Sequence, residues 1–387
     1  MHPSVIRQIN ASRIFHAIRQ RPNMSQREIA ELTGADKSTV SAVIKDFEAS
    51  GLIERTSRKS DNRPGRPGEC ISISARGGLL VGVHPNPEGI QYVVSGLDGE
   101  PIQAITRPLP RDPAKLGREV ATAVKKITAE ISRSHKEVRA VGISIPGLVS
   151  KGEVLTQSPN LGWKDVSLGE VLNEALDYPF YVDNNANASA IAEYYFGRGT
   201  ETGDFAYVES GSGVGAGMFL DGGVYRGVRG FAGEFGHTKI VPHGRLCRCG
   251  ALGCLSAYTS DYSIFQRLHQ KGIQVDTHDE VIVLAKQGNV TVLAILDEAG
   301  RHLGIGLSNL INLLNIPLFI LGGGFDAFAE YMRAGILASL EELALPPALE
   351  NCQIEQSRIG SSALPLGGIA LALEGCTSHH DSEATPW

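Results

Sequence analysis

The chain has 387 residues, of which 42% are hydrophobic and 20% charged, a composition typical of a soluble globular protein with two or three domains. Its apolar runs fall well short of the roughly 20 residues that a membrane-spanning helix needs, and residues 1–20 lack the apolar core and cleavage site of a signal peptide. We therefore expect a cytoplasmic protein without a membrane segment.

Charge is distributed unevenly along the chain, whose formal net charge is −6. Residues 1–70 carry 12 Lys and Arg against 8 Asp and Glu, whereas the remainder carries 24 against 34. A basic N-terminal part on an acidic protein favours a nucleic-acid contact that is confined to this end. On charge alone, an accidental excess of positive residues would explain the asymmetry as well.

The N-terminal part shows the pattern of three short helices. The first is predicted over residues 10–20, and the capping-box spacing of Ser25 and Glu28 starts the second. Gly34 breaks the second helix, and Asp36 or a neighbour caps the third. The residues expected to face the interior are Ile14, Phe15, Ile18, Ile29, Ala30, Leu32, Val40, Ile44 and Phe47. Two short helices around a tight glycine turn predict a helix-turn-helix.

The outward side of the third helix and the segment behind it are polar and basic. Residues 54–56 and 70–73 predict a small hairpin, or wing, and the loop between them contains two Arg-Pro pairs. Such side chains suit base edges, phosphates and a narrow minor groove. The residues expected to contact double-stranded DNA are Ser25, Gln26, Lys37, Ser38, Thr39, Ser41, Lys45, Arg55, Arg63 and Arg66. A solvated linker or a protein-interaction module would be the alternative explanation.

From about residue 79 the chain alternates short apolar strands, amphipathic stretches and glycine-rich turns. A first βββαβ set is predicted at 79–83, 91–94, 102–105, 116–132 and 140–145. A looser repeat follows, with strands predicted at 205–209, 216–220, 239–241 and 318–321. This repetition favours two related α/β lobes with a ligand-binding cleft between them.

Seven short motifs in a fixed order make a family resemblance specific. They are 145–149 (IPGLV), 158–163 (SPNLGW), 182–187 (VDNNAN), 211–217 (GSGVGAG), 233–237 (GEFGH), a cysteine cluster at 247–254, and 320–324 (ILGGG). Each motif alone is weak, but together, behind a winged helix-turn-helix, they carry a specific signal. Along nearly its whole length the chain resembles the ROK family of repressors, open reading frames and sugar kinases.

The resemblance implies an α/β protein, in which a winged helix-turn-helix precedes a two-lobed domain of the actin/hexokinase-like (ribonuclease H-like) ATPase fold. The expected divisions are the winged domain at 1–75, the first lobe at 76–200, its completing C-terminal helix at about 363–376, the second lobe at 201–362, and a disordered tail at 377–387. Family members with such an N-terminal domain are repressors, whereas the sugar kinases lack it.

Three of the six cysteines, Cys247, Cys249 and Cys254, lie within eight residues, and His237 stands ten positions upstream of the first. Three thiolates and an imidazole form a closed tetrahedral set that suits a structural Zn²⁺. In a reducing cytoplasm a metal explains the cluster better than disulfide bonds, with unliganded thiols as the alternative. The resemblance adds that one ring nitrogen of this histidine binds zinc while the other faces a sugar.

Departures from the sugar kinases argue against phosphotransfer. The kinases carry an Asp and a glycine turn near the ATP phosphates, where this chain has His84 followed by two prolines that offer no N–H donor. They also use an Asn-Asp pair whose Asp is the catalytic base; here the pair at 184–185 is Asn-Asn, with Asp183 beside it. The glycine motifs at 211–217 and 322–324, which contact the nucleotide in kinases, are retained, but turns with positive φ would require them anyway.

The resemblance also implies a sugar site made of side chains that pair adjacent hydroxyls. The residues it assigns to the effector are Gly147, Asn160, Asn184, Asn185, Glu234, His237 and Ser256. Ser256 stands where the family has a Glu, so with Asn185 the site loses two carboxylates. This loss favours an effector other than a common aldohexose, because a polar pocket rejects ligands that leave its groups unpaired. A vestigial cleft that binds nothing is the alternative.

These features predict a sugar-responsive transcriptional regulator, a repressor of carbohydrate uptake or catabolism genes, without enzymatic activity. Its expected partners are operator DNA, a sugar or sugar derivative, structural Zn²⁺, and copies of itself in a homodimer or homotetramer, with no membrane. Effector binding is expected to change the spacing of two winged domains, releasing DNA or, less often, promoting binding. The alternatives are a bifunctional ROK sugar kinase with a DNA-binding domain, and a DNA-binding protein whose second domain is purely structural.

Overall fold

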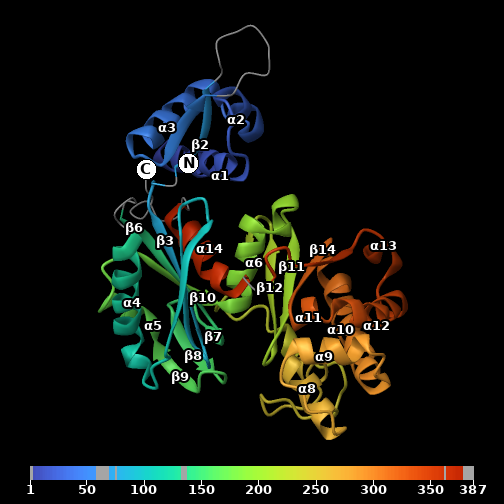
Figure 1. The fold of residues 1–387 in the computed structure, drawn as a ribbon. Coiled ribbons are helices and arrows are strands. Elements are labelled where there is room, and N and C mark those ends of the chain that lie inside the picture. The colour runs from blue at the N-terminus through green and yellow to red at the C-terminus, as the bar shows by residue number, and fades with distance from the viewer. Residues whose placement is uncertain (1–2, 58–68, 75, 132–136, 361–362, 378–387) are drawn as a thin grey trace. The chain divides into compact units, whose positions relative to one another are not determined.

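The computed structural model describes residues 3–57, 69–74, 76–131, 137–360 and 363–377 (Figure 1). Its contacts divide the chain into unit 1, with residues 1–147, 152–183 and 365–387, and unit 2, with residues 148–151 and 184–364. None of the helices in the described ranges is long and apolar enough to span a membrane.

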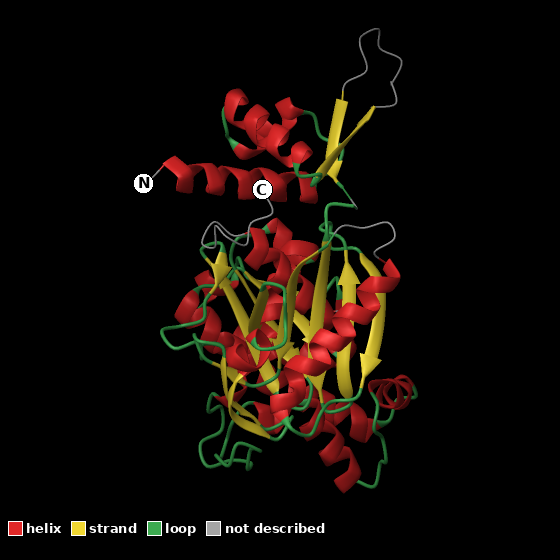
Figure 2. Cartoon of the chain, turned by 90° about the vertical axis from the view of Figure 1, so that its left-hand side faces the viewer, coloured by secondary structure: helices red, strands yellow, loops and turns green. Residues whose placement is uncertain are grey.

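The N-terminal part of unit 1 is the expected winged helix-turn-helix (Figure 2). Its elements are α1 (Pro3–Gln20), α2 (Gln26–Thr33), α3 (Lys37–Ala49), β1 (Ile53–Ser57) and β2 (Glu69–Ile73). The capping box is present, since Ser25 Oγ accepts from the N–H of Glu28 and the Glu28 carboxylate accepts from the N–H of Ser25. Asp36 caps α3, and Gly34 ends α2 in the left-handed region with φ 68°. The first helix is longer than expected, because it begins before residue 10.

The interior of this small domain agrees with the predicted apolar pattern at most positions. The fully buried members of the predicted set, at most 1% exposed, are Ile14, Phe15, Ile18, Ile29, Val40, Ile44 and Phe47. Two predicted members are wrong, since Leu32 is 43% exposed and Ala30 only half-buried. Thr33 is buried in their place and donates its hydroxyl to the carbonyl oxygen of Ile29 at 2.7 Å. The reason is geometric, because residues four apart share one face of so short a helix.

The larger part of unit 1 is built on a described sheet with the strand order β10-β6-β3-β4-β5 (Figure 1). Its strands are β3 (Leu79–Asn86), β4 (Gly89–Ser95), β5 (Pro101–Arg107), β6 (Val138–Ile145) and β10 (Phe180–Asn184). The short strands that follow β6 along the chain are β7 (Leu148–Val149), which is assigned to unit 2, and β8 (Val154–Ser158) and β9 (Trp163–Ser167) of unit 1. The helices are η1 (Pro113–Lys115), α4 (Leu116–Ile131), α5 (Leu168–Asn173) and, from the C-terminal end, α14 (Ala363–Thr377).

The C-terminal helix α14 lies directly on the strands β3 and β6. A Cβ atom on Gly142 would lie 1.9 Å from the carbonyl oxygen of Gly368, and one on Gly82 would lie 2.6 Å from that of Pro365. Only glycine permits backbones to approach this closely, so these positions explain how α14 seats on the sheet. The last helix of the chain therefore belongs to the first lobe.

Unit 2 repeats the same sheet topology in the order β13-β12-β11-β14-β15. Its strands are β11 (Phe205–Ser210), β12 (Val214–Leu220), β13 (Gly223–Val224), β14 (Leu318–Gly323) and β15 (Gln353–Gln356). In each unit the first three strands pair antiparallel and the fourth runs parallel to the first. The expectation of two related α/β lobes is thereby confirmed.

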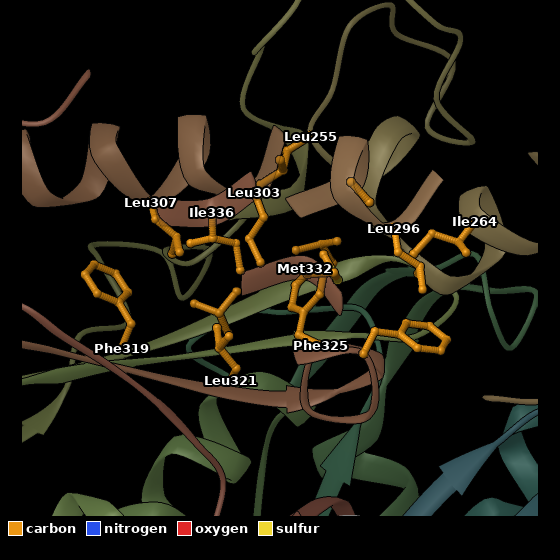
Figure 3. Close-up of a cluster of buried hydrophobic side chains, with 14 of the residues drawn as sticks. Leu255, Ile264, Leu296, Leu303, Leu307, Phe319, Leu321, Phe325, Met332 and Ile336 are labelled. Carbon is orange, nitrogen blue, oxygen red and sulfur yellow. The ribbon is translucent and has the colours of Figure 1, made fainter. Parts of the chain in front are cut away.

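The helices of unit 2 pack against this sheet, and buried apolar side chains from helices and strands form the core of the unit. They are α6 (Asn185–Phe196), η2 (Arg198–Glu201), η3 (Phe235–His237), α7 (Ser256–Thr259), α8 (Asp261–Gln270), α9 (His278–Lys286), α10 (Val290–Leu314), α11 (Gly324–Ala327), α12 (Ala329–Leu343) and α13 (Pro346–Leu349). Figure 3 shows apolar side chains filling the layer between helices and strands, among them Leu303 of α10, Met332 of α12 and Leu321 of β14. A Cβ atom on Gly300 would lie 2.3 Å from the carbonyl oxygen of Met332, so glycine lets α10 and α12 pack closely.

The strand expected at 239–241 is absent from the structure. Lys239 makes only an isolated antiparallel bridge with Cys254, and Ile240 donates its N–H to the carbonyl oxygen of Gly253 at 3.0 Å. The apolar residues of this segment are thus held by the turns of the cysteine cluster, and β13 is the third antiparallel strand of unit 2 instead.

The boundary between the lobes also differs from the expected position at residue 200. The main segment of unit 2 begins at Asn184, so that α6 belongs to the second lobe. The cause is close packing of α6 on β12, where a Cβ atom on Gly217 would lie 2.3 Å from the carbonyl oxygen of Ala186. The small residues of both elements were visible in the sequence, but their contact was not.

Candidate functional sites

The third helix of the winged domain presents an exposed polar surface. Lys37, Ser38, Ser41 and Lys45 are exposed and Thr39 is half-buried, as a recognition helix requires. The hydroxyls of Ser38 and Thr39 both donate to the carboxylate of Asp36, the latter at 2.6 Å. In this structure the two hydroxyls therefore complete the cap of α3.

Asp36 places a negative charge at the start of the helix that is expected to meet DNA. The hydrogen bonds from Ser38 and Thr39 hold the pKa of its carboxyl below the usual range. The carboxylate is therefore ionised at neutral pH and stabilises the N-terminus of α3 through the helix dipole.

Arg55 on β1 is bound by acidic neighbours within the winged domain. Its guanidinium contacts the carboxylates of Glu48 and Glu69, with Nη2 3.2 Å from Glu48 Oε2. A DNA contact by Arg55 would have to compete with these two ion pairs. Arg63 and Arg66 of the wing lie outside the described residues, and the side chains of Ser25 and Gln26 are half-buried at the start of α2.

The cysteine cluster of unit 2 could hold a metal ion. The ligand atoms of His237, Cys247, Cys249 and Cys254 all lie within 4.8 Å of one another. Cys249 Sγ is 3.7 Å from Cys254 Sγ, and Cys247 Sγ is 4.0 Å from His237 Nδ1. Four such donors around one point make a closed set that leaves no position for a reacting molecule.

Tight turns hold the cysteine loop in this shape. Gly250 and Gly253 have φ of 88° and 77°, a region that favours glycine, and the Cys247 N–H donates to the carbonyl oxygen of Ala251 at 2.8 Å. Arg245 ties the loop to α10, because its guanidinium contacts Glu298 Oε1 at 2.8 Å. The cluster is therefore formed by the fold itself.

A cation lies beside the sulfur atoms. Lys239 Nζ donates to Cys254 Sγ at 2.7 Å. Three thiolates around a divalent ion would carry a net charge of −1, which this ammonium group would balance. Such a contact to a ligand atom is typical of the outer shell of a metal site.

His237 connects the cysteine cluster to the candidate effector residues. Its Nδ1 is on the side of Cys247, and its Nε2 lies 3.8 Å from Glu234 Oε2. Close approach fixes this turn on β12, since a Cβ atom on Gly233 would lie 2.2 Å from the carbonyl oxygen of Ala216. The two ring nitrogens thus face a metal-binding group and a carboxylate respectively.

Ser256 has a structural role that the sequence did not indicate. It is buried, and its Oγ accepts the N–H of Val214 at 3.1 Å. A Cβ atom on Gly236 would lie 2.3 Å from the same oxygen. The Ser256 side chain therefore holds the start of β12, although its hydroxyl proton can still be donated.

Asn184 and Asn185 occupy the start of α6 with different partners. Asn184 Oδ1 caps the helix by accepting the N–H of Ala186 at 2.8 Å. Asn185 Nδ2 donates to Glu209 Oε1 of β11. The predicted pair is therefore divided between a helix cap and a contact with a carboxylate.

Glu209 is the residue that sequence reasoning missed. It is only 8% exposed, and burial raises the pKa of its carboxyl to about 7. The signal was available, because Glu209 is a charged residue in an otherwise apolar strand directly before the glycine loop. It returns a carboxyl group to the neighbourhood of Asn185.

Gly147 and Asn160 belong to unit 1, whereas the other candidate effector residues belong to unit 2. Gly147 has φ 129°, and a Cβ atom there would lie 2.5 Å from the carbonyl oxygen of Gln157. Asn160 is half-buried in the turn between β8 and β9. Within unit 1 both residues therefore lie around the same hairpin.

His84 in unit 1 is a neutral group in a closed environment. It is 4% exposed, its Nδ1 lies 2.8 Å from the carbonyl oxygen of Ser144, and burial lowers its pKa. The strand β3 continues through it, and Pro85 is opposite Ile90 in the ladder to β4. No open turn is found at this place.

Comparison with known proteins agrees with this architecture. The model of the ROK family matches residues 87–375, and a MarR family model matches residues 7–64. A xylose repressor of Caldicellulosiruptor bescii is 30% identical, over 97% of this chain and 98% of that protein. A ROK family transcriptional regulator described as a homologue of the E. coli MLC protein has a TM-score of 0.84 at 23% identity, over 97% of this chain and 98% of that one.

The larger domain also has enzymes among its structural relatives. A ROK family glucokinase from Streptomyces griseus, solved with glucose and AMPPNP, has a TM-score of 0.65 at 28% identity, over 77% of this chain and 100% of that one. Relatives of both kinds share the two-lobed domain, and the repressor and the regulator match the winged domain too. The chain belongs to the ROK family.

Proposed function

We propose that the chain is a sugar-responsive transcriptional regulator that binds operator DNA through α3 and the wing. One observation carries the proposal: the exposed side of α3, with Lys37, Ser41 and Lys45, stands on a winged domain in the same chain as a complete ROK domain. The similarity to a xylose repressor extends over both parts.

The proposed effector is a sugar or sugar derivative. Its candidate contacts in unit 2 are Asn185, Glu234 and the Nε2 atom of His237, with Glu209 orienting the Asn185 amide. The similarity to a glucokinase that binds glucose supports a sugar-sized ligand. Gly147 and Asn160 are proposed as further contacts, and Asn184 and Ser256 are proposed to support the site through the backbone atoms they hold.

We further propose that the ROK domain does not phosphorylate its ligand. Its His84 is a buried imidazole hydrogen-bonded to Ser144, where phosphotransfer would require a carboxylate and an open turn. Asn185 cannot accept a proton as a base, and its amide is bound to Glu209. A bifunctional sugar kinase is the alternative, and clear turnover of ATP with any hexose in a phosphotransfer assay would establish it.

The metal proposed for the cysteine cluster is a structural Zn²⁺. Ligand atoms at about 2.0 Å (nitrogen) and 2.3 Å (sulfur) from a tetrahedral ion are separated by roughly 3.4–3.8 Å. The separations of 3.7 Å between Cys249 and Cys254 and 4.0 Å between Cys247 and His237 are close to this range. The ion would lock the imidazole of His237 in place. Metal analysis should find about one zinc per chain.

The regulator is proposed to act as a homodimer, or as a homotetramer of two dimers. Two winged domains would then contact two operator half-sites, and effector binding would change their spacing. The difference in DNA affinity between the sugar-free and sugar-bound states of the protein sets the size of the response to sugar.

The test is fluorescence anisotropy on DNA from upstream of the gene, repeated with a panel of sugars and sugar phosphates. We expect binding that prefers this DNA over unrelated DNA and that shifts with one sugar. Salt-sensitive binding without sequence preference or sugar response would leave only a general DNA-binding domain and would refute the regulator proposal.

A further inference from the structure

The buried carboxylate of Asp261 contacts residues at two neighbouring glycine turns in unit 2, those of the motifs at 211–217 and 322–324. Asp261 is the first residue of α8, and its side chain is 10% exposed. Its Oδ1 accepts the hydroxyl of Ser210 at 2.5 Å, and its Oδ2 lies 2.8 Å from His278 Nε2 of α9. The Asp261 N–H donates back to Ser210 Oγ at 3.0 Å, so the two residues are bound twice.

The same carboxylate touches the second turn. A Cβ atom on Gly324, at the start of α11, would lie 1.8 Å from Asp261 Oδ1. Ser210 and Gly323 are partners in the parallel ladder of β11 and β14, so both turns begin at the same end of the sheet. Carboxyl ends of neighbouring parallel strands are where α/β folds bind ligands, and glycine turns there bind phosphates through backbone N–H groups.

The backbone donors of the first turn are partly engaged within the chain. The Gly211 N–H donates to the carbonyl oxygen of Gly213 at 2.9 Å, and the Val214 N–H donates to Ser256 Oγ at 3.1 Å. Arg248, the guanidinium beside the turn, donates to the carbonyl oxygen of Ser212 at 3.3 Å and stacks on the ring of Tyr262. These contacts occupy two of the N–H donors that the turn could offer to a phosphate.

A second acid, whose pKa is raised to about 7, adds negative charge when the pH is above that value. Glu209 immediately precedes Ser210 on β11 and is buried, and its carboxyl interacts electrostatically with that of Asp261. His278 Nε2 contacts Asp261 Oδ2, so a protonated imidazole balances one of these two charges and leaves the other. A polyphosphate placed between the turns would meet carboxylate oxygens where it needs N–H donors, and like charges in a buried site repel strongly.

We propose that Asp261 is a specificity-determining residue that closes the glycine turns of this lobe to nucleotide phosphates. The inference rests on the proposed function and extends it, since a regulator of this kind senses its sugar independently of ATP and ADP. In this proposal the glycine motifs have a structural role, because Asp261 is hydrogen-bonded to Ser210 and lies against the backbone of Gly324.

The experiment measures MgADP binding to the full-length protein by isothermal titration calorimetry. The variants are Asp261→Gly, which removes the carboxylate, Asp261→Asn, which keeps its size without the charge, and Asp276→Asn as control, since the Asp276 side chain is 90% exposed. We expect no saturable binding to the wild type or the control up to about millimolar MgADP, and affinity at least about tenfold higher in Asp261→Gly, with Asp261→Asn between them.

Saturable binding of MgADP to the wild type would overturn the proposal. So would variants at Asp261 that are folded by circular dichroism yet bind MgADP no better than the wild type. Operator binding and the sugar response are measured on the same proteins without nucleotide. If the wild type showed neither operator binding nor a sugar response, the proposed regulator would be refuted. The nucleotide titration tests only the role of Asp261.

Discussion

Replacing Glu209 with Gln should stabilise the chain above neutral pH and change its stability little at pH 4.5. Burial raises the pKa of the Glu209 carboxyl from its ordinary 4.5 to about 7. Between these values the folded chain holds a proton that the unfolded chain has released. The stability contributed by this proton is complete below pH 4.5 and is lost as the pH rises through 7.

The size of the effect follows from the same pKa values. Each unit of pKa difference corresponds to 1.36 kcal/mol, so an ionised Glu209 costs the folded state about 3 kcal/mol at pH 8. Gln is neutral at every pH, and its side-chain oxygen can accept the hydrogen bond from Asn185. We therefore expect Glu209→Gln to raise the free energy of unfolding by about 2–3 kcal/mol at pH 8 and by less than about 0.5 kcal/mol at pH 4.5.

Urea unfolding followed by circular dichroism at several pH values between 4.5 and 8 measures this difference. Glu350→Gln is the matched control, because Glu350 is exposed and the substitution removes the same charge. A gain in stability that is equal at both ends of the pH range would refute the raised pKa of Glu209. A loss at pH 8 would show instead that the carboxylate has a favourable charged partner.

Three further predictions concern the metal, the DNA and the core. Cys249→Ser should reduce bound zinc from about one per chain to near zero in metal analysis, whereas Cys352→Ser, outside the cluster, should keep it. Lys45→Ala should weaken operator and unrelated DNA alike and lower the slope of log affinity against log salt by about 1; an unchanged slope in anisotropy titrations would exclude a phosphate contact. Leu303→Ala should lower the free energy of unfolding by about 2–5 kcal/mol, because Leu303 is fully buried, whereas the 41% exposed Leu337 should tolerate the same change with little loss in urea unfolding.

The parts of the fold that local sequence determines were predictable. The capping box of Ser25 and Glu28 and the cap at Asp36 depend on residues at most three positions apart. Runs of neighbouring apolar residues likewise indicated seven strands of the two sheets, whereas β10, β13 and β15 were not predicted. The cysteine cluster was also accessible, because its three sulfur ligands lie within eight residues. Contacts between distant segments were not, which is why the boundary at α6 and the absent strand at 239–241 differ from expectation.

The candidate site shows the same limit more sharply. Glu209 and Asp261 are single acidic residues, and their partners are identified only when β11 lies beside α6 and α8. The sequence indicated that Asn185 and Ser256 lack the carboxylates of the family's kinases, but not that two buried acids lie close by. Pairing Asn185 with Glu209 is a property of three-dimensional packing, since 24 residues separate them along the chain.

The two kinds of substitution have one physical consequence for the proposed regulator. In this proposal the amide of Asn185 stands where a base would deprotonate a sugar hydroxyl, and the carboxylate of Asp261 stands where phosphates would bind, so both residues oppose phosphotransfer. Neither disturbs the scaffold, because Asn184 still caps α6 and Ser210 still pairs with Gly323. A sensor that phosphorylated its effector would consume the signal that it reports, and its DNA affinity would then follow turnover instead of sugar concentration. Under this proposal, a lobe that keeps its sugar site and has lost its phosphate site binds its effector reversibly. At a fixed protein concentration the occupancy of DNA then follows effector concentration, to an extent set by the affinity difference between the two states.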